Sequence, residues 1–335
     1  MKHKDSTSGD LHAGPGAAPD VIKAVFHDAD EQAVQVRGWD TCYQQMTPGP
    51  FYGQLFEAWI GDMQVFRETT NQAILQRGAG RAGSLSFGIP LALSKPVTWR
   101  GTPVTSGAIG CFRSDEELDM CTPPDFDLVV VSLNPDDFFA FAEQVEGKDV
   151  RRLIHGKSVA HVSAARKELL TQVLLTVTRS IGDNPALLAD ERVRRSLREA
   201  VYGTLVAAME SDNAYPVPGS TRQRSRIVAQ AQEYLRCHVD EPISIADLCE
   251  TLGVSRRTLQ YGFQEVLGIN PVRYLRAIRL NGVRRELKSG KPHIAVQDVA
   301  ARWGFWHLSH FSADYREMFR ELPSDTLRRH SPVLP

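Results

Sequence analysis

Side chains that hydrogen-bond to the edges of nucleic-acid bases gather in one short segment of the C-terminal third of the chain. Arginine pairs with guanine and glutamine with adenine through two hydrogen bonds each, and a good pair gives about 1–3 kcal/mol of discrimination between bases. Serine and threonine hydroxyls suit phosphate oxygens, which position a protein on a duplex without reading its sequence. The predicted base readers are Arg256, Arg257, Gln260 and Tyr261, and the predicted phosphate contacts are Ser255 and Thr258.

A second segment of the same kind starts at Trp306 and is less polar. Its imidazoles suit base edges, its apolar side chains suit thymine methyl groups, and its hydroxyls suit phosphates. The predicted base readers here are His307 and His310, and the predicted phosphate contacts are Ser309 and Ser312.

Both segments belong to a repeated unit. Residues 245–254 match residues 296–305 in type and order, and with one inserted residue the match continues as far as Pro271 and Pro323. Glycine stands at the turn of each copy, and it adopts a positive backbone φ without strain, so it can end a short helix before a tight turn. The pattern therefore predicts a helix, a turn and a second helix in each copy, with the polar segments in the first turns of each second helix.

A basic stretch, residues 271–290, joins the two copies. Its spacing predicts one helix of about 28 Å at 1.5 Å per residue. Adjacent major grooves on one face of DNA recur about every 34 Å, so such a helix could place both copies on one side of a duplex. Its arginines either lie on a solvated face or bind phosphates, and we expect phosphate contacts from Arg276 and Arg279.

Charge is divided unevenly along the chain. From residue 222 onward there are 18 Lys and Arg against 12 Asp and Glu, a net charge of +6, whereas residues 1–221 have a net charge of −7. A basic C-terminal part beside an acidic N-terminal part is what nucleic-acid binding by one half requires. The 5 cysteines form no close pairs, which favours a reducing compartment without disulfides.

The N-terminal half has a different pattern of residue types. Residues 34–134 contain short apolar runs broken by Gly and Pro, which predict a β-rich domain built as a cupin-like barrel or a sandwich. Residues 135–212 have the apolar spacing of amphipathic helices, and residues 213–225 have the Pro and Gly content of a linker. Residues 1–33 lack an apolar core and are expected to be a disordered lead-in. The expected fold is multidomain: a mainly β N-terminal domain with a helical segment, then an all-α domain with tandem helix-turn-helix units at 226–327.

Residues 226–327 resemble the DNA-binding domain of the AraC/XylS family of transcription regulators. The strings LCETLGVSRRTLQYGFQEVLGINPVRYL and VQDVAARWGFWHLSHFSADYREMFRELP follow the family pattern. Departures occur at Arg320, where the family usually has Gly, and at Thr326, where it often has Tyr. The resemblance implies a cytoplasmic activator that binds double-stranded DNA as a homodimer, contacts RNA polymerase and answers to a small-molecule effector. It implies no membrane association and no cofactor for DNA binding itself.

Within this family, residues 39–327 resemble the regulators of ethanolamine-utilisation operons. The resemblance is carried by PGPFYGQLFEAWIGDMQVFRETTNQAILQRG, SLSFGIP, VSRRTLQ, RLNGVRREL and GFWHL. It implies control of ethanolamine catabolic genes by ethanolamine and adenosylcobalamin. Two alternatives stay open, namely a different effector and an N-terminal half that only dimerises. Four aromatic residues either line an effector cavity or belong to the ordinary core, so no ligand-binding residue is assigned. They are Trp59, Phe66, Phe87 and Trp99.

The alternative from another class is an enzyme, a cupin-type metalloenzyme with a DNA-binding appendage. Cupin metal sites use clustered histidines, yet residues 28–154 contain no histidine, so no metal site is expected. GAGRAG at 78–83 matches a dinucleotide-binding fingerprint, but a strand-like segment follows it instead of a helix, which favours a hairpin turn. Because no catalytic motif is found, we expect no enzymatic activity.

Overall fold

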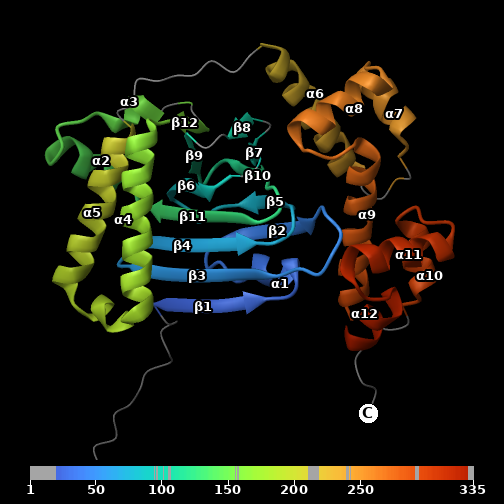
Figure 1. Ribbon diagram of the computed structural model, residues 1–335, viewed down its shortest axis with the longest axis horizontal. Coiled ribbons are helices and arrows are strands. Elements are labelled where there is room, and N and C mark those ends of the chain that lie inside the picture. Colours follow the sequence, from blue (N-terminus) through green and yellow to red (C-terminus); the bar gives the residue numbers. More distant parts are fainter. Residues whose placement is uncertain are drawn as a thin grey trace, which may run out of the picture.

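A computed structural model describes residues 20–330 of the chain, except 94, 96, 101, 105–106, 155, 157, 210–218, 239–240, 242 and 291–293. It consists of a β-rich N-terminal domain, covered on one face by helices, and an all-α C-terminal domain (Figure 1). This confirms the fold class predicted from the sequence.

Two antiparallel sheets make up the N-terminal domain. They pack around a shared apolar core to which Phe66, Trp99 and Val130 belong, so the domain is built as two facing layers. In order across the first sheet, the strands are β1 (Val21–Phe26), β3 (Gly53–Ile60), β4 (Met63–Thr70), β11 (Phe126–Leu133), β6 (Leu85–Ala92), β9 (Ala108–Arg113) and β12 (Val159–His161). Across the second they are β2 (Asp40–Gln45), β5 (Ile74–Ala79), β10 (Glu117–Cys121), β7 (Val97–Trp99) and β8 (Thr102–Val104).

β11 shows why one strand is apolar without alternation. Leu128 and Val130 belong to the core between the sheets, whereas Val129, Val131 and Leu133 belong to a second core on the outer face of the first sheet. A strand that is covered on both faces needs apolar side chains at every position.

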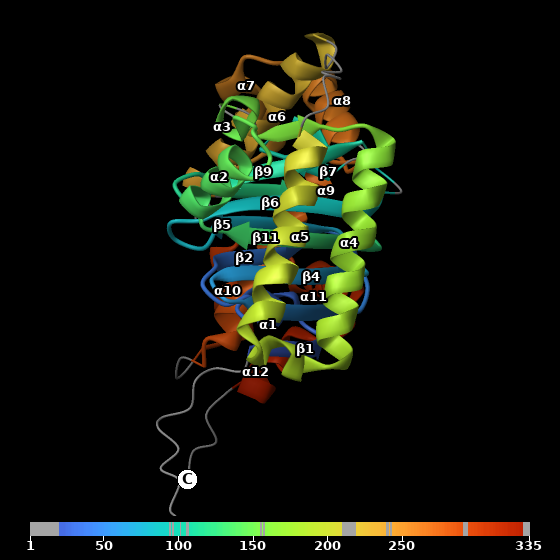
Figure 2. The same cartoon turned by 90° about the vertical axis from the view of Figure 1, so that its left-hand side faces the viewer.

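Helices close that second core. Figure 2 shows α4 (Ala164–Asp183) and α5 (Glu191–Met209) lying across the strands of the first sheet, where Leu174 and Leu205 pack in the core. α2 (Pro135–Gln144), α3 (Val150–Ile154) and the 3-10 helix η1 (Pro185–Ala189) complete this part. No helix in the described part of the chain has the length and apolarity needed to span a membrane.

Three local predictions need correction. β1 and α1 (Ala29–Ala33) lie within the predicted lead-in at 1–33, and β1 pairs along its whole length with β3, so this part belongs to the β-rich domain. The linker predicted at 213–225 is helical from Gly219 onward, while its beginning, like residues 1–19, lies outside the described residues. Residues 78–83 pass from β5 to β6, which lie in different sheets, so they form a crossover instead of a hairpin.

The C-terminal domain is organised around one long helix, α9 (Pro271–Lys288), which contacts both the other helices and the N-terminal domain. Asn281 of α9 is paired with the end of β2: Gln45 N donates to Asn281 Oδ1 (3.0 Å), and Asn281 Nδ2 donates to Gln45 O (2.8 Å). The other helices are α6 (Gly219–Cys237), α7 (Ile245–Leu252), α8 (Arg256–Val266), α10 (Val296–Arg302), α11 (Leu308–Phe319) and α12 (Pro323–His330).

Candidate nucleic-acid interface

The first helix-turn-helix unit consists of α7 and α8. A capping box begins α7, in which Ser244 N donates to Asp247 Oδ2 (2.8 Å) and Asp247 N donates to Ser244 Oγ (3.2 Å). Gly253 ends α7 with a φ of 63°, and Val254 N donates back to Cys249 O (3.0 Å). A residue with a side chain is strained in this left-handed conformation, so glycine is favoured at the turn. The turn predicted at Gly253 from the sequence is therefore confirmed.

α8 presents the first predicted reading surface. Ser255 Oγ accepts a hydrogen bond from Thr258 N (3.1 Å) and bonds Thr258 Oγ1 (2.9 Å), so both predicted phosphate contacts form the cap of this helix. Leu259 and Phe263 are fully buried, which turns the opposite face of α8 to solvent. The structure brings together on that exposed face all four predicted base readers of this unit: Arg256, Arg257, Gln260 and Tyr261.

Two of these side chains support each other. The guanidinium carbon of Arg257 lies 5.3 Å from the ring centroid of Tyr261, and Arg257 Nη2 donates to the Tyr261 hydroxyl (3.4 Å). A cation held over an aromatic face loses part of its freedom before it meets a ligand. The contact with Tyr261 therefore limits the orientations open to the exposed Arg257 side chain.

The other two border a hollow of about 330 Å³ between α8 and the start of α9. Arg256 and Gln260 line it from α8, and Arg273 and Arg276 line it from α9. Arginines of two helices thus line one recess, and arginine is a residue type that commonly contacts phosphate oxygens. Arg273 is not among the residues selected from the sequence, although its place in the basic stretch was the available signal.

The second unit consists of α10 and α11. Gly304 makes its turn with a φ of 79°, and Phe305 N donates to Ala300 O (2.9 Å). His307, Ser309 and His310 are exposed, and Ser312 is half-buried. The rings of His307 and His310 lie edge to face, with centroids 6.2 Å apart.

Large apolar side chains extend this second surface. Trp306 is 71% exposed and Leu308 is 45% exposed, although both are large enough to be expected in a core. Exposed apolar groups of this kind mark a contact surface when they stand among polar residues. Trp306, which begins this segment in the sequence but is not among the predicted base or phosphate contacts, thus extends the exposed surface.

α9 separates the two units. Its 18 residues correspond to about 27 Å, and Figure 1 shows α8 near one end of it and α11 near the other. Arg276 is exposed and pairs with Asp314 of α11 (Nη1 to Oδ1, 3.2 Å).

Arg279 is placed differently from Arg276. Arg279 Nη2 donates to Ile243 O (2.8 Å), and its guanidinium packs on Gly304, where a Cβ would lie 3.4 Å from Arg279 Cζ. Burial lowers the pKa of this guanidinium. This position favours a structural role, holding both units to α9, over the predicted phosphate contact.

The structure shows how the chain accommodates Arg320 and Thr326, the two residues that depart from the family pattern. Arg320 caps α11 in the left-handed region, with a φ of 59°, which is where glycine would be unstrained. Thr326 is buried and its Oγ1 bonds both the Tyr315 hydroxyl (2.8 Å) and Glu321 Oε1 (2.7 Å). The last helical turn is therefore packed despite the replaced residue.

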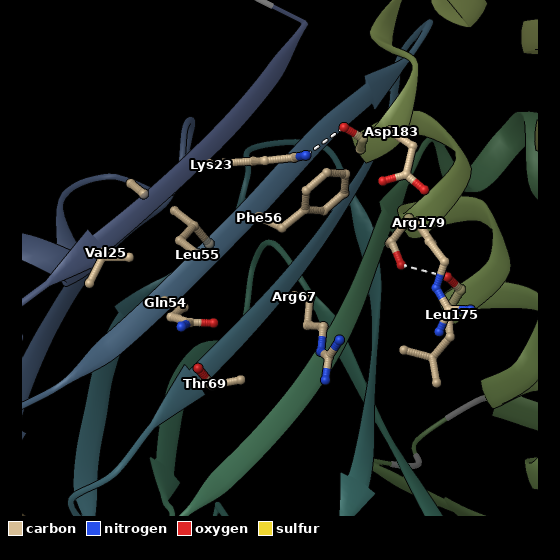
Figure 3. Close-up of a pocket in the computed structure, with 13 residues that line it drawn as sticks. Lys23, Val25, Gln54, Leu55, Phe56, Arg67, Thr69, Leu175, Arg179 and Asp183 are labelled. Atoms are coloured by element: carbon tan, nitrogen blue, oxygen red, sulfur yellow. Dashed lines mark hydrogen bonds between the residues drawn. The ribbon is translucent and has the colours of Figure 1, made fainter.

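A large open groove lies far from these helices, on the N-terminal domain between α4 and strands β1, β3 and β4 (Figure 3). It has a volume of about 530 Å³, and its cations include Lys23, Arg67 and Arg179. Arg67 is bound by Asp127 (2.9 and 2.6 Å), and Lys23 donates to Gly182 O. Two of the three cationic side chains are thus already hydrogen-bonded to other groups of the protein. In the described part of the chain, no three His, Cys, Asp or Glu side chains gather as metal ligands would.

Comparisons with known proteins match part of the chain. A family model described as a helix-turn-helix domain matches residues 248–329. The chain is 34% identical over 148 residues to the probable thc operon regulatory protein of Rhodococcus erythropolis, a match that covers 44% of this chain and 45% of that protein. It is 36% identical over 99 residues to the XylDLEGF operon transcriptional activator 2 of Pseudomonas putida, covering 29% of this chain and 63% of that protein.

A solved structure, that of a probable AraC family transcriptional regulator from Rhodopseudomonas palustris, has 36% sequence identity and a TM-score of 0.31, covering 32% of this chain and 99% of that one. The chain spans less than two thirds of the length of either curated relative. The residues that the family model matches include both turns and the second helix of each unit, α8 and α11. The C-terminal domain of this chain is therefore a helix-turn-helix domain, and its sequence is similar to that of a probable AraC family transcriptional regulator.

Proposed function

We propose that the chain is a sequence-specific transcription regulator that binds two successive major grooves of double-stranded DNA. The observation that carries this proposal is the pair of exposed reading faces at opposite ends of α9. Their separation along a helix of about 27 Å suits grooves that recur about every 34 Å. No covalent chemistry is needed for this function.

The first unit has the side chains for direct reading of bases. Arg257 and Gln260 are the proposed readers of guanine and adenine, and Arg256 and Tyr261 extend the same face. Ser255, Thr258 and Arg276 are the proposed phosphate contacts of this side.

The second unit presents a less polar surface to DNA. His307 and His310 are the proposed base contacts, and Trp306 supplies an apolar contact beside them. Ser309 and Ser312 are the proposed phosphate contacts. We expect this half-site to be rich in thymine, because its methyl group suits exposed apolar side chains.

The N-terminal domain is the proposed sensor. Activation is favoured by the similarity to proteins named as activators of the XylDLEGF operon. By resemblance, the candidate effectors are ethanolamine and adenosylcobalamin, and the further partners are RNA polymerase and a second copy of the chain, in the cytoplasm. These assignments rest on the resemblance and on the presence of a separate domain beside the helix-turn-helix domain.

Selection from a random double-stranded DNA library tests the central proposal. We expect enrichment of a bipartite sequence whose halves lie about 10 base pairs apart, with binding that weakens steeply as salt is raised. Equal binding to every sequence would refute it. Titration on a promoter upstream of ethanolamine catabolic genes, with and without the two candidate effectors, then tests the finer assignment.

A further inference from the structure

The two reading helices, α8 and α11, end in carbonyl groups that the N-terminal domain binds. The last carbonyls of a helix have no partner within it, so they need a donor from elsewhere when they are buried. At the end of α8, Val266 O accepts a hydrogen bond from Thr98 Oγ1 of β7 (2.7 Å). At the end of α11, Met318 O accepts one from Gly49 N (3.0 Å) and one from Gln45 Nε2 (3.0 Å). One domain therefore holds both reading helices at corresponding positions.

The donors are buried and held in place by the N-terminal domain. Thr98 is 4% exposed and Gln45 is 2% exposed. Gln45 stands at the end of β2, where its backbone exchanges two hydrogen bonds with Asn281 of α9. Gln45 Nε2 also donates to Thr47 O (2.8 Å) and Gly49 O (2.8 Å), which fixes both the amide and the loop that supplies the Gly49 N–H. A buried side chain with several hydrogen bonds keeps one position, so it can locate the carbonyl that it binds.

One sheet joins the two sets of donors. In the second sheet, β5 and β10 lie between β2 and β7, so three strand-to-strand steps, about 14 Å, separate the outer two of these strands. Thr98 pairs with Cys121 of β10, which pairs with Leu75 of β5, and residues paired in this way point to the same face of the sheet. Leu75 and Cys121 pack in the apolar core that the C-terminal helices form. The outer face of the second sheet thus supports the C-terminal domain between the two points of attachment.

We propose, building on the DNA-binding function proposed above, that the N-terminal domain sets the position of α8 relative to α11 and thereby the spacing of half-sites that the chain accepts. Thr98, Gln45 and Gly49 are the positioning residues. They bind the C-terminal ends of the reading helices, whereas the proposed base contacts lie in the first turns. α9 fixes the distance between the two units along its axis. The hydrogen bonds from the second sheet give each reading helix a second point of attachment, which limits its rotation about that axis.

A fixed pair of reading helices should accept one spacing of half-sites. One base pair added to B-DNA moves the second half-site by about 3.4 Å and rotates it by about 35° around the duplex axis. Reading helices that were free to rotate about α9 would follow this shift at little cost, whereas helices held at their far ends cannot follow it. Preference for one spacing therefore reports the positioning, because a general loss of stability weakens binding to the same extent at every spacing.

Titration of the full chain with DNA tests the proposal. The probes are the selected bipartite site and two variants of it, in which one base pair is inserted or removed between the halves. The wild type should bind both variants at least about tenfold more weakly than the selected site. Thr98→Val keeps the size of the side chain and removes the donor, so the same comparison should give a difference of about twofold or less. A wild type indifferent to spacing, or a Thr98→Val variant with the full preference of the wild type, would overturn the proposal.

Three further variants isolate the hydrogen bonds. Thr98→Ser retains the hydroxyl and should retain the spacing preference. Thr122→Val is the matched control, since Thr122 is equally buried and its hydroxyl bonds the backbone of Ile74 within the N-terminal domain (3.1 Å to Ile74 N). It should also retain the preference. Gln45→Met removes the amide that binds α11 and should relax the preference as Thr98→Val does. Equal relaxation in Thr122→Val and Thr98→Val would contradict the proposal, because it would trace the effect to a general loosening of the domain.

Hydrogen exchange in the absence of DNA separates this inference from the proposed function. Thr98→Val should speed amide exchange in the last turn of α8 at least about fivefold, because the helix end opens more readily without its bond to Thr98, and Thr122→Val should leave that exchange unchanged. Unchanged exchange in Thr98→Val would overturn the inference even where DNA binding is specific. Absence of specific DNA binding by the wild type would instead refute the proposed function, and the exchange result would still decide whether the N-terminal domain holds α8.

Discussion

Gly282 of α9 packs directly against the indole of Trp303, such that a methyl group on Gly282 would lie 2.2 Å from the ring. Trp303 Nε1 also donates to Glu286 Oε2 (2.9 Å), one turn farther along α9. This close contact and this hydrogen bond are two of the contacts that hold the second helix-turn-helix unit on α9.

Gly282→Ala should destabilise the protein. The added methyl group cannot fit without moving the indole, and overpacking of this kind costs about 1–3 kcal/mol. Urea unfolding should show the loss, and DNA binding should weaken at the second half-site. Gly203→Ala in α5 is the matched control, since its methyl group would lie 3.4 Å from Glu146 Oε1 and 4.0 Å from Phe141 Cζ, which are ordinary contact distances. This control should gain up to about 1 kcal/mol because alanine favours a helix. A change of the same sign in both variants would contradict the packing argument.

Arg320→Gly should stabilise the protein. Arg320 ends α11 with a φ of 59° and an exposed side chain, so glycine removes strain without removing a buried contact. We expect the free energy of unfolding to rise by about 0.5–1 kcal/mol. This is the strain relieved in the folded state minus the cost of the larger conformational entropy of glycine in the unfolded chain. Arg316→Gly, inside the same helix, should lose about 1 kcal/mol. If Arg320→Gly showed no gain in urea unfolding, strain at this residue would be ruled out.

The C-terminal domain could be predicted largely because its signals are local. Gly253 and Gly304 mark the turns, and Ser255 marks the start of α8, so residue types alone locate the reading face. Arg279 could not be placed in this way. Its partner is the carbonyl oxygen of Ile243, 36 residues away, and a backbone acceptor leaves no trace in the sequence.

The N-terminal domain was predicted less completely because its features depend on pairing. β1 (Val21–Phe26) is a strand only through its ladder with β3, and a short apolar run in a polar tail gives no sign of a distant partner. Glu68 stands on β4, where a charged residue in a strand ordinarily predicts a solvent-facing position. It is buried because a second sheet covers that face, which no local pattern shows.

Arg257→Ala should lose about 1–3 kcal/mol of DNA-binding energy at one base position. Arg257 is exposed and held over Tyr261, an orientation suited to reading a base. Binding should be measured on the selected site and on single-base variants of it. Equal weakening on every variant would make Arg257 a phosphate contact instead.

Arg276→Ala should weaken binding to all sequences by a similar factor. The slope of log affinity against log salt should fall by about one, because one phosphate contact is lost. Asp314→Asn is the control, since it removes the ion pair at 3.2 Å but leaves Arg276 available to DNA. That variant should bind DNA at least as tightly as the wild type, and weaker binding would show that the pair itself positions Arg276.

Asp28 ties the two domains together. Its Oδ2 lies 2.6 Å from Arg284 Nη1 and its Oδ1 lies 2.8 Å from Lys288 Nζ, both on α9, and the carboxylate also caps α1. Burial alone would raise the pKa of Asp28, but Arg284, Lys288 and a backbone hydrogen bond together hold that pKa below its ordinary value of 3.8. A carboxyl whose pKa is lowered by folding stabilises the fold above its unfolded value, and this contribution is lost as pH falls through the folded value.

Asp28→Asn should therefore be less stable than the wild type by about 2–4 kcal/mol at pH 7, since it breaks a buried ion-pair cluster while asparagine still caps α1. The difference should begin to shrink as pH falls below 3.8, where the carboxyl of the unfolded chain takes up a proton, and should disappear only as pH falls through the lower pKa of the folded state. Urea unfolding between pH 7 and pH 3 measures both variants, with Asp136→Asn as the control, because the Asp136 side chain is 87% exposed and only distantly paired. A difference that stays constant over this range would mean that Asp28 stabilises the fold through its cap or its packing, and that the charges joining the two domains contribute nothing.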